Sequence, residues 1–96
     1  MRLYVDDRRP KPQGWECTES ITKAIHWLSM GIVDEISLDF DCGLENESYA
    51  AVACYIAAMP VDLRPKKIHI HTDNPAGRKL LNEILFEKDR DTDNGT

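Results

Sequence analysis

Short apolar segments alternate with helix-like segments along this chain, and this alternation limits the folds that it can adopt. Residues 3–5, 36–38 and 67–72 are predicted strands, because they are short, rich in β-branched and aliphatic residues, and end at polar residues. Residues 21–28 and 45–59 have the apolar spacing of amphipathic helices. Strands that alternate with helices favour a parallel sheet covered on both faces. We therefore predict an α/β domain.

Residues that start or stop helices mark the ends of these segments. Thr18 is a suitable cap for the first helix, and Gly31 is a suitable end for it. Pro60 stops the second helix, whose alanines favour the helical state. Asn74 followed by Pro75 is typical of a helix start. This last helix has one apolar stripe, formed by Leu80, Leu81, Ile84 and Leu85.

The size and charge of the chain exclude several classes of protein. Ninety-six residues are enough for one domain, predicted at residues 1–88, with a polar tail at residues 89–96. The 17 acids and 12 bases argue against a domain that binds nucleic acid mainly by neutralising phosphates. The sequence contains no apolar run long enough for a membrane span and no export signal. The three scattered cysteines then suggest reduced thiols, so we expect a cytoplasmic protein without a membrane partner.

Acidic residues and a histidine stand at the ends of the predicted strands. Asp6 and Asp7 follow the first strand, Asp39 and Asp41 follow a middle strand, and His71 ends a late strand. The carboxyl ends of parallel strands meet at one edge of a sheet, where ligands bind. Carboxylates that converge repel one another, and a divalent cation such as Mg²⁺ relieves the repulsion. The pattern predicts a cation site beside a phosphate; the alternative is that these acids cap helices and face solvent.

Three blocks of sequence carry these residues. Residues 4–15 read Y-V-D-D-R-R-P-K-P-Q-G-W, residues 37–43 read S-L-D-F-D-C-G, and residues 71–78 read H-T-D-N-P-A-G-R. The blocks resemble those of the cyclic-phosphate processing receiver domain, a small standalone relative of the receiver domains of response regulators. They span residues 4–78 in the family's order, so the resemblance covers most of the chain.

The resemblance implies a fold. It is a compact, receiver-like (flavodoxin-like) three-layer α/β sandwich with a truncated parallel sheet of about four strands in the order 2-1-3-4. Residues 15–18 would form the second strand, and the first receiver helix would be collapsed into the loop at residues 8–14. The chain would lack the last strand–helix unit of a receiver, which carries a lysine in that family. Ordinary aspartyl-phosphate signalling is therefore not expected.

The resemblance also implies roles for the acids and for the third block. The implied ligands of Mg²⁺ or Mn²⁺ are Asp6, Asp7 and Asp39. The implied catalytic groups are Asp39, Asp41 and His71, of which His71 would transfer a proton. The implied phosphate-binding groups are Thr72, Asn74 and Arg78, at the start of a helix whose free N–H groups and positive end favour anions. The expected ligand is a small phosphorylated compound or a cyclic phosphate, and nucleic acid is expected only through a terminal cyclic phosphate.

Other features point in different directions. Phe40 stands where the family pattern has histidine, and a protein without that group would bind a phosphoester without turning it over. The alternative function is a non-catalytic interaction or inhibitor module that binds a partner protein. His69, His71 and Asp73 form an H-x-H-x-D run, a weaker signal for a zinc site. Trp15 is expected to be a core residue that anchors the long loop.

Overall fold

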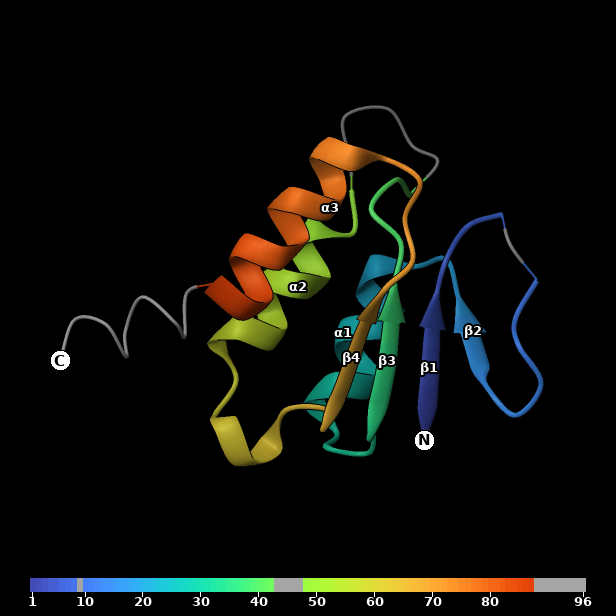
Figure 1. Cartoon of the computed structure of the whole chain (residues 1–96). Helices are drawn as coiled ribbons and strands as arrows, with labels where there is room; N and C mark the ends of the chain where they lie inside the picture. The colour runs from blue at the N-terminus through green and yellow to red at the C-terminus, as the bar shows by residue number, and fades with distance from the viewer. Residues whose placement is uncertain (9, 43–47, 88–96) are drawn as a thin grey trace, which may run out of the picture.

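A single parallel sheet forms the centre of the protein in the computed structural model, which describes residues 1–8, 10–42 and 48–87 (Figure 1). Its strands are β1 (Arg2–Val5), β2 (Glu16–Thr18), β3 (Glu35–Leu38) and β4 (Lys67–Ile70). Their order in the described sheet is β2-β1-β3-β4, and all three pairings are parallel. The prediction of a four-stranded parallel sheet in this order is confirmed. The predicted tail, residues 89–96, lies outside the described residues.

Helical segments connect the strands in the described part of the chain. The helices are α1 (Ile21–Ser29), α2 (Ala50–Ala58) and α3 (Pro75–Asn82). A short 3₁₀ turn, η1 (Val61–Leu63), precedes β4, and a π-helical turn, η2 (Glu83–Glu87), extends α3. None of the described helices has the length and apolar character needed to cross a bilayer.

Two helices begin later than the sequence predicted. Ser20, not Thr18, caps α1, and its hydroxyl accepts a hydrogen bond of 3.1 Å from the N–H of Lys23. Thr18 ends β2 instead, where its hydroxyl accepts a hydrogen bond from the N–H of Ser20. Helix α2 begins at Ala50 and not at residue 45, and residues 43–47 lie outside the described residues. The predicted cap of α3, Asn74, is confirmed.

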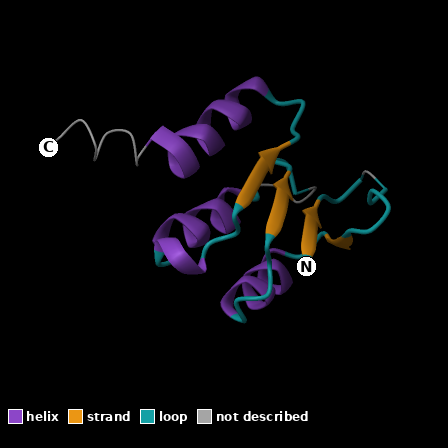
Figure 2. Cartoon of the chain, turned by 60° about the horizontal axis from the view of Figure 1, so that its bottom comes forward, coloured by secondary structure: helices purple, strands orange, loops and turns teal. Residues whose placement is uncertain are grey.

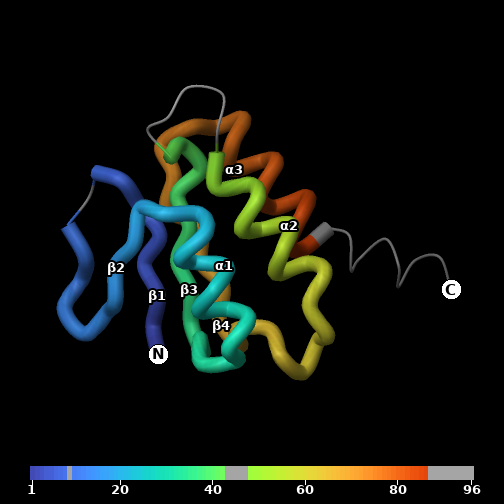
Figure 3. The backbone as a smooth tube through the Cα atoms, turned by 180° about the vertical axis from the view of Figure 1, so that it is seen from behind, coloured from blue at the N-terminus to red at the C-terminus, as the bar shows by residue number. Residues whose placement is uncertain are grey.

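One face of the sheet carries the apolar core. Leu3 pairs with Ile36 across β1 and β3, Val5 pairs with Leu38, and all four side chains are fully buried. Both crossover connections run in the same direction across the sheet, so α1 and α2 lie on the same face. Figure 2 shows the helices on one side of the strands, and Figure 3, seen from that side, shows α1 in front of the sheet and α3 beside α2. Leu81 of α3 belongs to the same core cluster.

The opposite face, called the open face below, is covered by none of the described helices. Polar and aromatic residues occupy it in two aligned rows, which are Arg2–Glu35–Lys67 and Cys17–Tyr4–Ser37–His69. Ion pairs cross the first row and reach the second, since Glu35 lies 3.4 Å from the guanidinium of Arg2 and 2.7 Å from the imidazole of His69. Charged side chains exposed to water, and not a helix, therefore cover this part of the open face.

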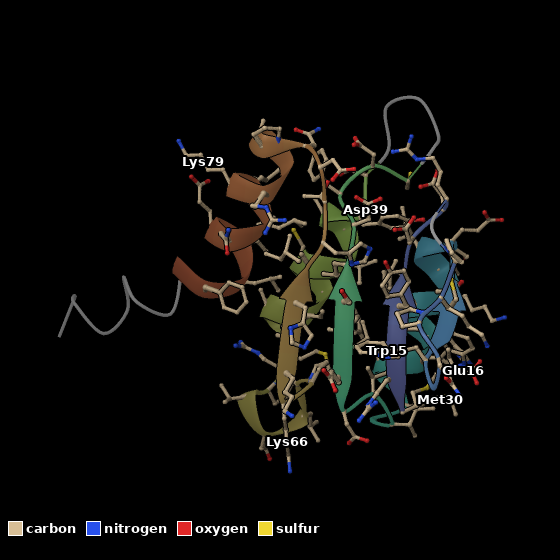
Figure 4. All side chains as sticks on the ribbon, turned by 45° about the vertical axis from the view of Figure 1, so that its right-hand side comes forward. Trp15, Glu16, Met30, Asp39, Lys66 and Lys79 are labelled. Atoms are coloured by element: carbon tan, nitrogen blue, oxygen red, sulfur yellow. The ribbon has the colours of Figure 1, made fainter. Side chains whose placement is uncertain are left out.

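The loop before β2 covers part of the open face. Trp15 packs edge-on against Tyr4, with ring centroids 6.2 Å apart, and Arg2 lies 6.0 Å from its ring (Figure 4). The third layer of the expected sandwich is thus this loop and not a helix, because Pro10, Pro12 and Gly14 interrupt residues 10–15. Trp15 anchors the loop as predicted, but it is half-buried on the open face, so its predicted place in the core was wrong.

Candidate functional site

Three of the predicted side chains meet just beyond the carboxyl ends of β1, β3 and β4. The strands end in register, so the residues that follow them, Asp6, Asp39 and His71, lie at the same level. One ligand atom from each lies within 4.8 Å of the other two. Asp6 and Asp39 are 3% and 4% exposed, and the His71 side chain is 16% exposed. We call these three residues the carboxyl-end cluster; Figure 4 shows Asp39 above the end of β3.

The carboxyl-end cluster belongs to the open face. Side chains alternate along a strand, so Asp6 lies on the same side as Tyr4, and Asp39 lies on the same side as Ser37. The absence of a described helix on this face leaves the cluster next to the loop and not beneath a helix. Buried acids therefore lie close to a side of the domain that a ligand can approach.

The ring of His71 is held on three sides. Its Nε2 atom lies 2.9 Å from Oδ2 of Asp6, and its Nδ1 atom lies 2.6 Å from the hydroxyl of Ser37. The ring stacks on Tyr4 with centroids 4.3 Å apart and an angle of 5° between the planes. Neither Ser37 nor Tyr4 was predicted as a site residue. The signal for both was available, because each stands two positions before a predicted acid on the same face of its strand.

Backbone N–H groups hold the two buried carboxylates. The N–H of Arg8 donates to Oδ1 of Asp6 at 2.8 Å, and the N–H of Phe40 donates to Oδ1 of Asp39 at 2.7 Å. Such contacts stabilise the charged form of a carboxylate, yet two neighbouring buried charges of the same sign still repel. Oxygen atoms of buried carboxylates are the donors that Mg²⁺ prefers. The donor set of Asp6 and Asp39 therefore fits a hard divalent cation, with His71 bonded to one of the carboxylates.

Asp7 is not one of the three residues of the carboxyl-end cluster. It lines an open pocket of about 420 Å³ together with Arg8, Pro10, Cys17, Thr18, Glu19 and Asp6. Its Oδ1 atom is the one buried side-chain polar atom, among the described residues, without a hydrogen-bond partner. Because Asp6 belongs both to this pocket and to the cluster, the orphaned oxygen of Asp7 adds to the fit for a cation.

Burial changes the acidity of two groups near these acids. Burial, and then the negative charge of Asp7, raise the pKa of Tyr49, whose hydroxyl donates to the carbonyl of Glu19 at 2.8 Å. Burial, and then the charge of Asp6, raise the pKa of the Cys17 thiol. Cys17 therefore stays protonated at neutral pH and is a poor nucleophile.

Asp41 does not join the carboxyl-end cluster. It is exposed and forms an isolated antiparallel bridge with Ser48. The chain turns after Phe40, whose carbonyl accepts a hydrogen bond of 2.8 Å from the N–H of Tyr49. The carboxylate predicted to activate water thus lies apart from the two that could hold a cation.

The predicted phosphate-binding residues each have partners within their own segment. The Thr72 hydroxyl accepts a hydrogen bond from the N–H of Asn74 at 3.2 Å, and the Asn74 side chain accepts one from the N–H of Gly77 at 3.0 Å. The Arg78 guanidinium donates to the carbonyl oxygens of Ile70 and Thr72 at 3.3 and 3.1 Å. Part of the free N–H surface expected at the start of α3 is therefore already occupied by its own cap.

Comparison with known families agrees with this geometry. A family model described as the cyclic-phosphate processing receiver domain matches residues 1–87. The chain belongs to this family. No curated protein and no solved structure gives a significant match to it.

An apolar side chain follows Asp39 in this receiver domain. Phe40 packs against the first turn of α3, where a Cβ atom on Gly77 would lie 2.3 Å from Cγ of the Phe40 ring. The ring therefore requires glycine at position 77. Phe40 brings no titratable group to this side of the carboxyl-end cluster.

The zinc site suggested by the H-x-H-x-D run is not formed in the described part of the receiver domain. His69 is bonded to Glu35 on the open face, and its side chain is 52% exposed. The single metal-type group among the described residues joins His71 to Asp6 and Asp39, and it includes neither His69 nor Asp73.

Proposed function

We propose that this receiver domain binds a divalent cation and, beside it, a small phosphoester such as a cyclic phosphate. The observation that carries the proposal is the carboxyl-end cluster, in which two buried carboxylates and an imidazole bring their ligand atoms within 4.8 Å. Buried charges of one sign are costly unless an opposite charge is near. Membership of the cyclic-phosphate processing family supports the class of ligand.

The residues would divide the work as follows. Asp6 and Asp39 would hold the cation through their buried oxygens, and the orphaned oxygen of Asp7 lies next to them. A bound Mg²⁺ or Mn²⁺ would supply a positive charge that attracts and polarises a phosphoryl oxygen. Arg8, whose N–H holds Asp6, also lines the adjoining pocket, where its cation favours an anionic ligand.

Binding without turnover is favoured over hydrolysis by two observations. Asp41 lies apart from the carboxyl-end cluster, and Phe40 brings no acid or base. The side chains of Thr72, Asn74 and Arg78 already form hydrogen bonds within the chain, which supports the same conclusion. The second candidate function is therefore a non-catalytic interaction or inhibitor module that binds a partner protein.

The proposal is tested by thermal denaturation with Mg²⁺ or Mn²⁺, with and without a panel of 2′,3′-cyclic and 3′,5′-cyclic nucleotides. Ligands that bind only the folded state raise the melting temperature by mass action. We expect the cation to raise it by several degrees, and a cyclic phosphate to raise it further. Asp39→Asn should abolish both shifts, whereas Asp62→Asn, which changes an exposed acid in η1, should keep them.

The same measurements separate the two candidates. Opening of a cyclic nucleotide to the linear nucleoside monophosphate would show turnover in addition to binding. A melting temperature that responds to none of the cations and cyclic phosphates would contradict the proposed site. Partner binding that survives Asp39→Asn would then favour the interaction module.

A further inference from the structure

We propose that Ser37 and His71 are positioning residues that fix the orientation of the Asp6 carboxylate. The consequence for cation binding rests on the proposed function. The hydrogen-bonded chain itself can be tested without any ligand, so the two can fail separately.

The direction of each hydrogen bond follows from the chemistry of the partners. An ionised carboxylate only accepts hydrogen bonds, so the Nε2 atom of His71 carries the hydrogen that it donates to Asp6. In a neutral ring the Nδ1 atom then has a lone pair and no hydrogen. The hydroxyl of Ser37, 2.6 Å away, must therefore be the donor to Nδ1. Asp6 and Ser37 thus favour the same tautomer of His71.

The sheet holds this chain rigidly. Ser37 lies in β3 and is 6% exposed, so its hydroxyl is confined within the open face. Tyr4 lies in β1, and its ring lies parallel to that of His71 at 4.3 Å. The imidazole cannot turn without losing the stacking contact and both hydrogen bonds. A site group supported by strands is held more precisely than one supported by a loop.

Asp6 receives hydrogen bonds from two directions. The N–H of Arg8 donates to Oδ1, and Nε2 of His71 donates to Oδ2. These two bonds fix the plane of the carboxylate before a cation arrives. Groups that orient a metal ligand in this way typically change the affinity for the metal by about 10- to 100-fold when they are removed.

The tautomer of His71 is measured by long-range ¹H–¹⁵N NMR on protein labelled at histidine, at about pH 8, where an ordinary imidazole is neutral. The chain has three histidines, and His71→Phe identifies the signals of this ring. We expect the Nε2–H tautomer in the wild type, and in Ser37→Ala a shift of the Nδ1 signal, because that atom loses its hydrogen bond from the hydroxyl. Ser37→Thr keeps the hydroxyl and should restore the wild-type signals, and Ser29→Ala, an exposed serine of α1, should not change them.

The effect on the cation is measured by titration with Mg²⁺ on the same variants. We expect Ser37→Ala to weaken Mg²⁺ binding by about tenfold and Ser37→Thr to restore it. His71→Phe keeps a flat ring on Tyr4 but donates no hydrogen bond, and it should weaken binding at least as much. An Nδ1–H tautomer in the wild type, or an Nδ1 signal that is unchanged in Ser37→Ala, would overturn the inference. A wild type that binds no divalent cation would overturn the proposed function, while the NMR result would still decide the positioning of His71.

Discussion

The two faces of the sheet are built by neighbouring residues of the same strands, yet they serve different ends. Leu38 is fully buried beneath the helices, whereas Ser37 points to the open face and bonds the imidazole of His71. The helix-covered face is apolar and buried, and the open face carries ion pairs, stacked rings and the carboxyl-end cluster. One face therefore supplies the stability of the domain, and the other holds its polar site.

The largest expected effect is on the helix-covered face. Leu38→Ala should lower the free energy of unfolding by about 3 kcal/mol, because it removes buried methyl groups and leaves a cavity. His69→Ala, on the open face, should lower it by less than about 1 kcal/mol, because the side chain is half exposed. Urea unfolding of both variants measures the difference. Equal losses in the free energy of unfolding would contradict the view that the helix-covered face supplies most of the stability.

A smaller effect should appear at alkaline pH, on the helix-covered face. Burial raises the pKa of the Tyr49 phenol in the folded state. The stability that the protonated phenol contributes is therefore complete below its unfolded pKa of about 10, and it is lost as the pH rises above that value. Stability should fall there by about 1.4 kcal/mol for each pH unit. Tyr49→Phe should remove this part of the slope, and Tyr55→Phe should keep it. Unfolding between pH 8 and 11 tests it, and identical slopes in all three proteins would refute it.

The smallest effect is expected in the charged row of the open face. Glu35→Gln removes the partner of Arg2 and His69, whose side chains are 58% and 52% exposed. Exposed ion pairs contribute little, so the free energy of unfolding should change by about 0.5 kcal/mol or less. A loss of more than about 2 kcal/mol in urea unfolding would show that this row, like the core, is needed to hold the sheet together.

Much of the fold could be predicted because strand ends and helix faces leave periodic signals. The boundaries were less certain where two residues can do the same task. Thr18 and Ser20 both have hydroxyls that cap helices, and the pairing of Thr18 with Val5 in the sheet leaves the cap of α1 to Ser20. The prolines of residues 8–14 already indicated that a loop, not a helix, follows β1. The contacts of Trp15 with Tyr4 and Arg2 depend on tertiary packing and could not be predicted.

The candidate site was predicted best where strand geometry alone decides. Asp6, Asp39 and His71 converge because their strands end in register. The contacts of Arg78 could not be predicted, because a long flexible side chain on a helix can reach several acceptors.

The contacts of Arg78 also have a consequence for the solubility of the protein. β4 is an edge strand, and the N–H of His71 faces β3, so the neighbouring carbonyls of Ile70 and Thr72 point outward. Unpaired outward groups on an edge strand invite another chain to add a strand, which leads to aggregation. The guanidinium occupies both carbonyls, and α3 lies beside them. Arg78 thereby protects the carboxyl half of the edge and favours a sheet that ends at β4 over one that continues into a neighbouring molecule.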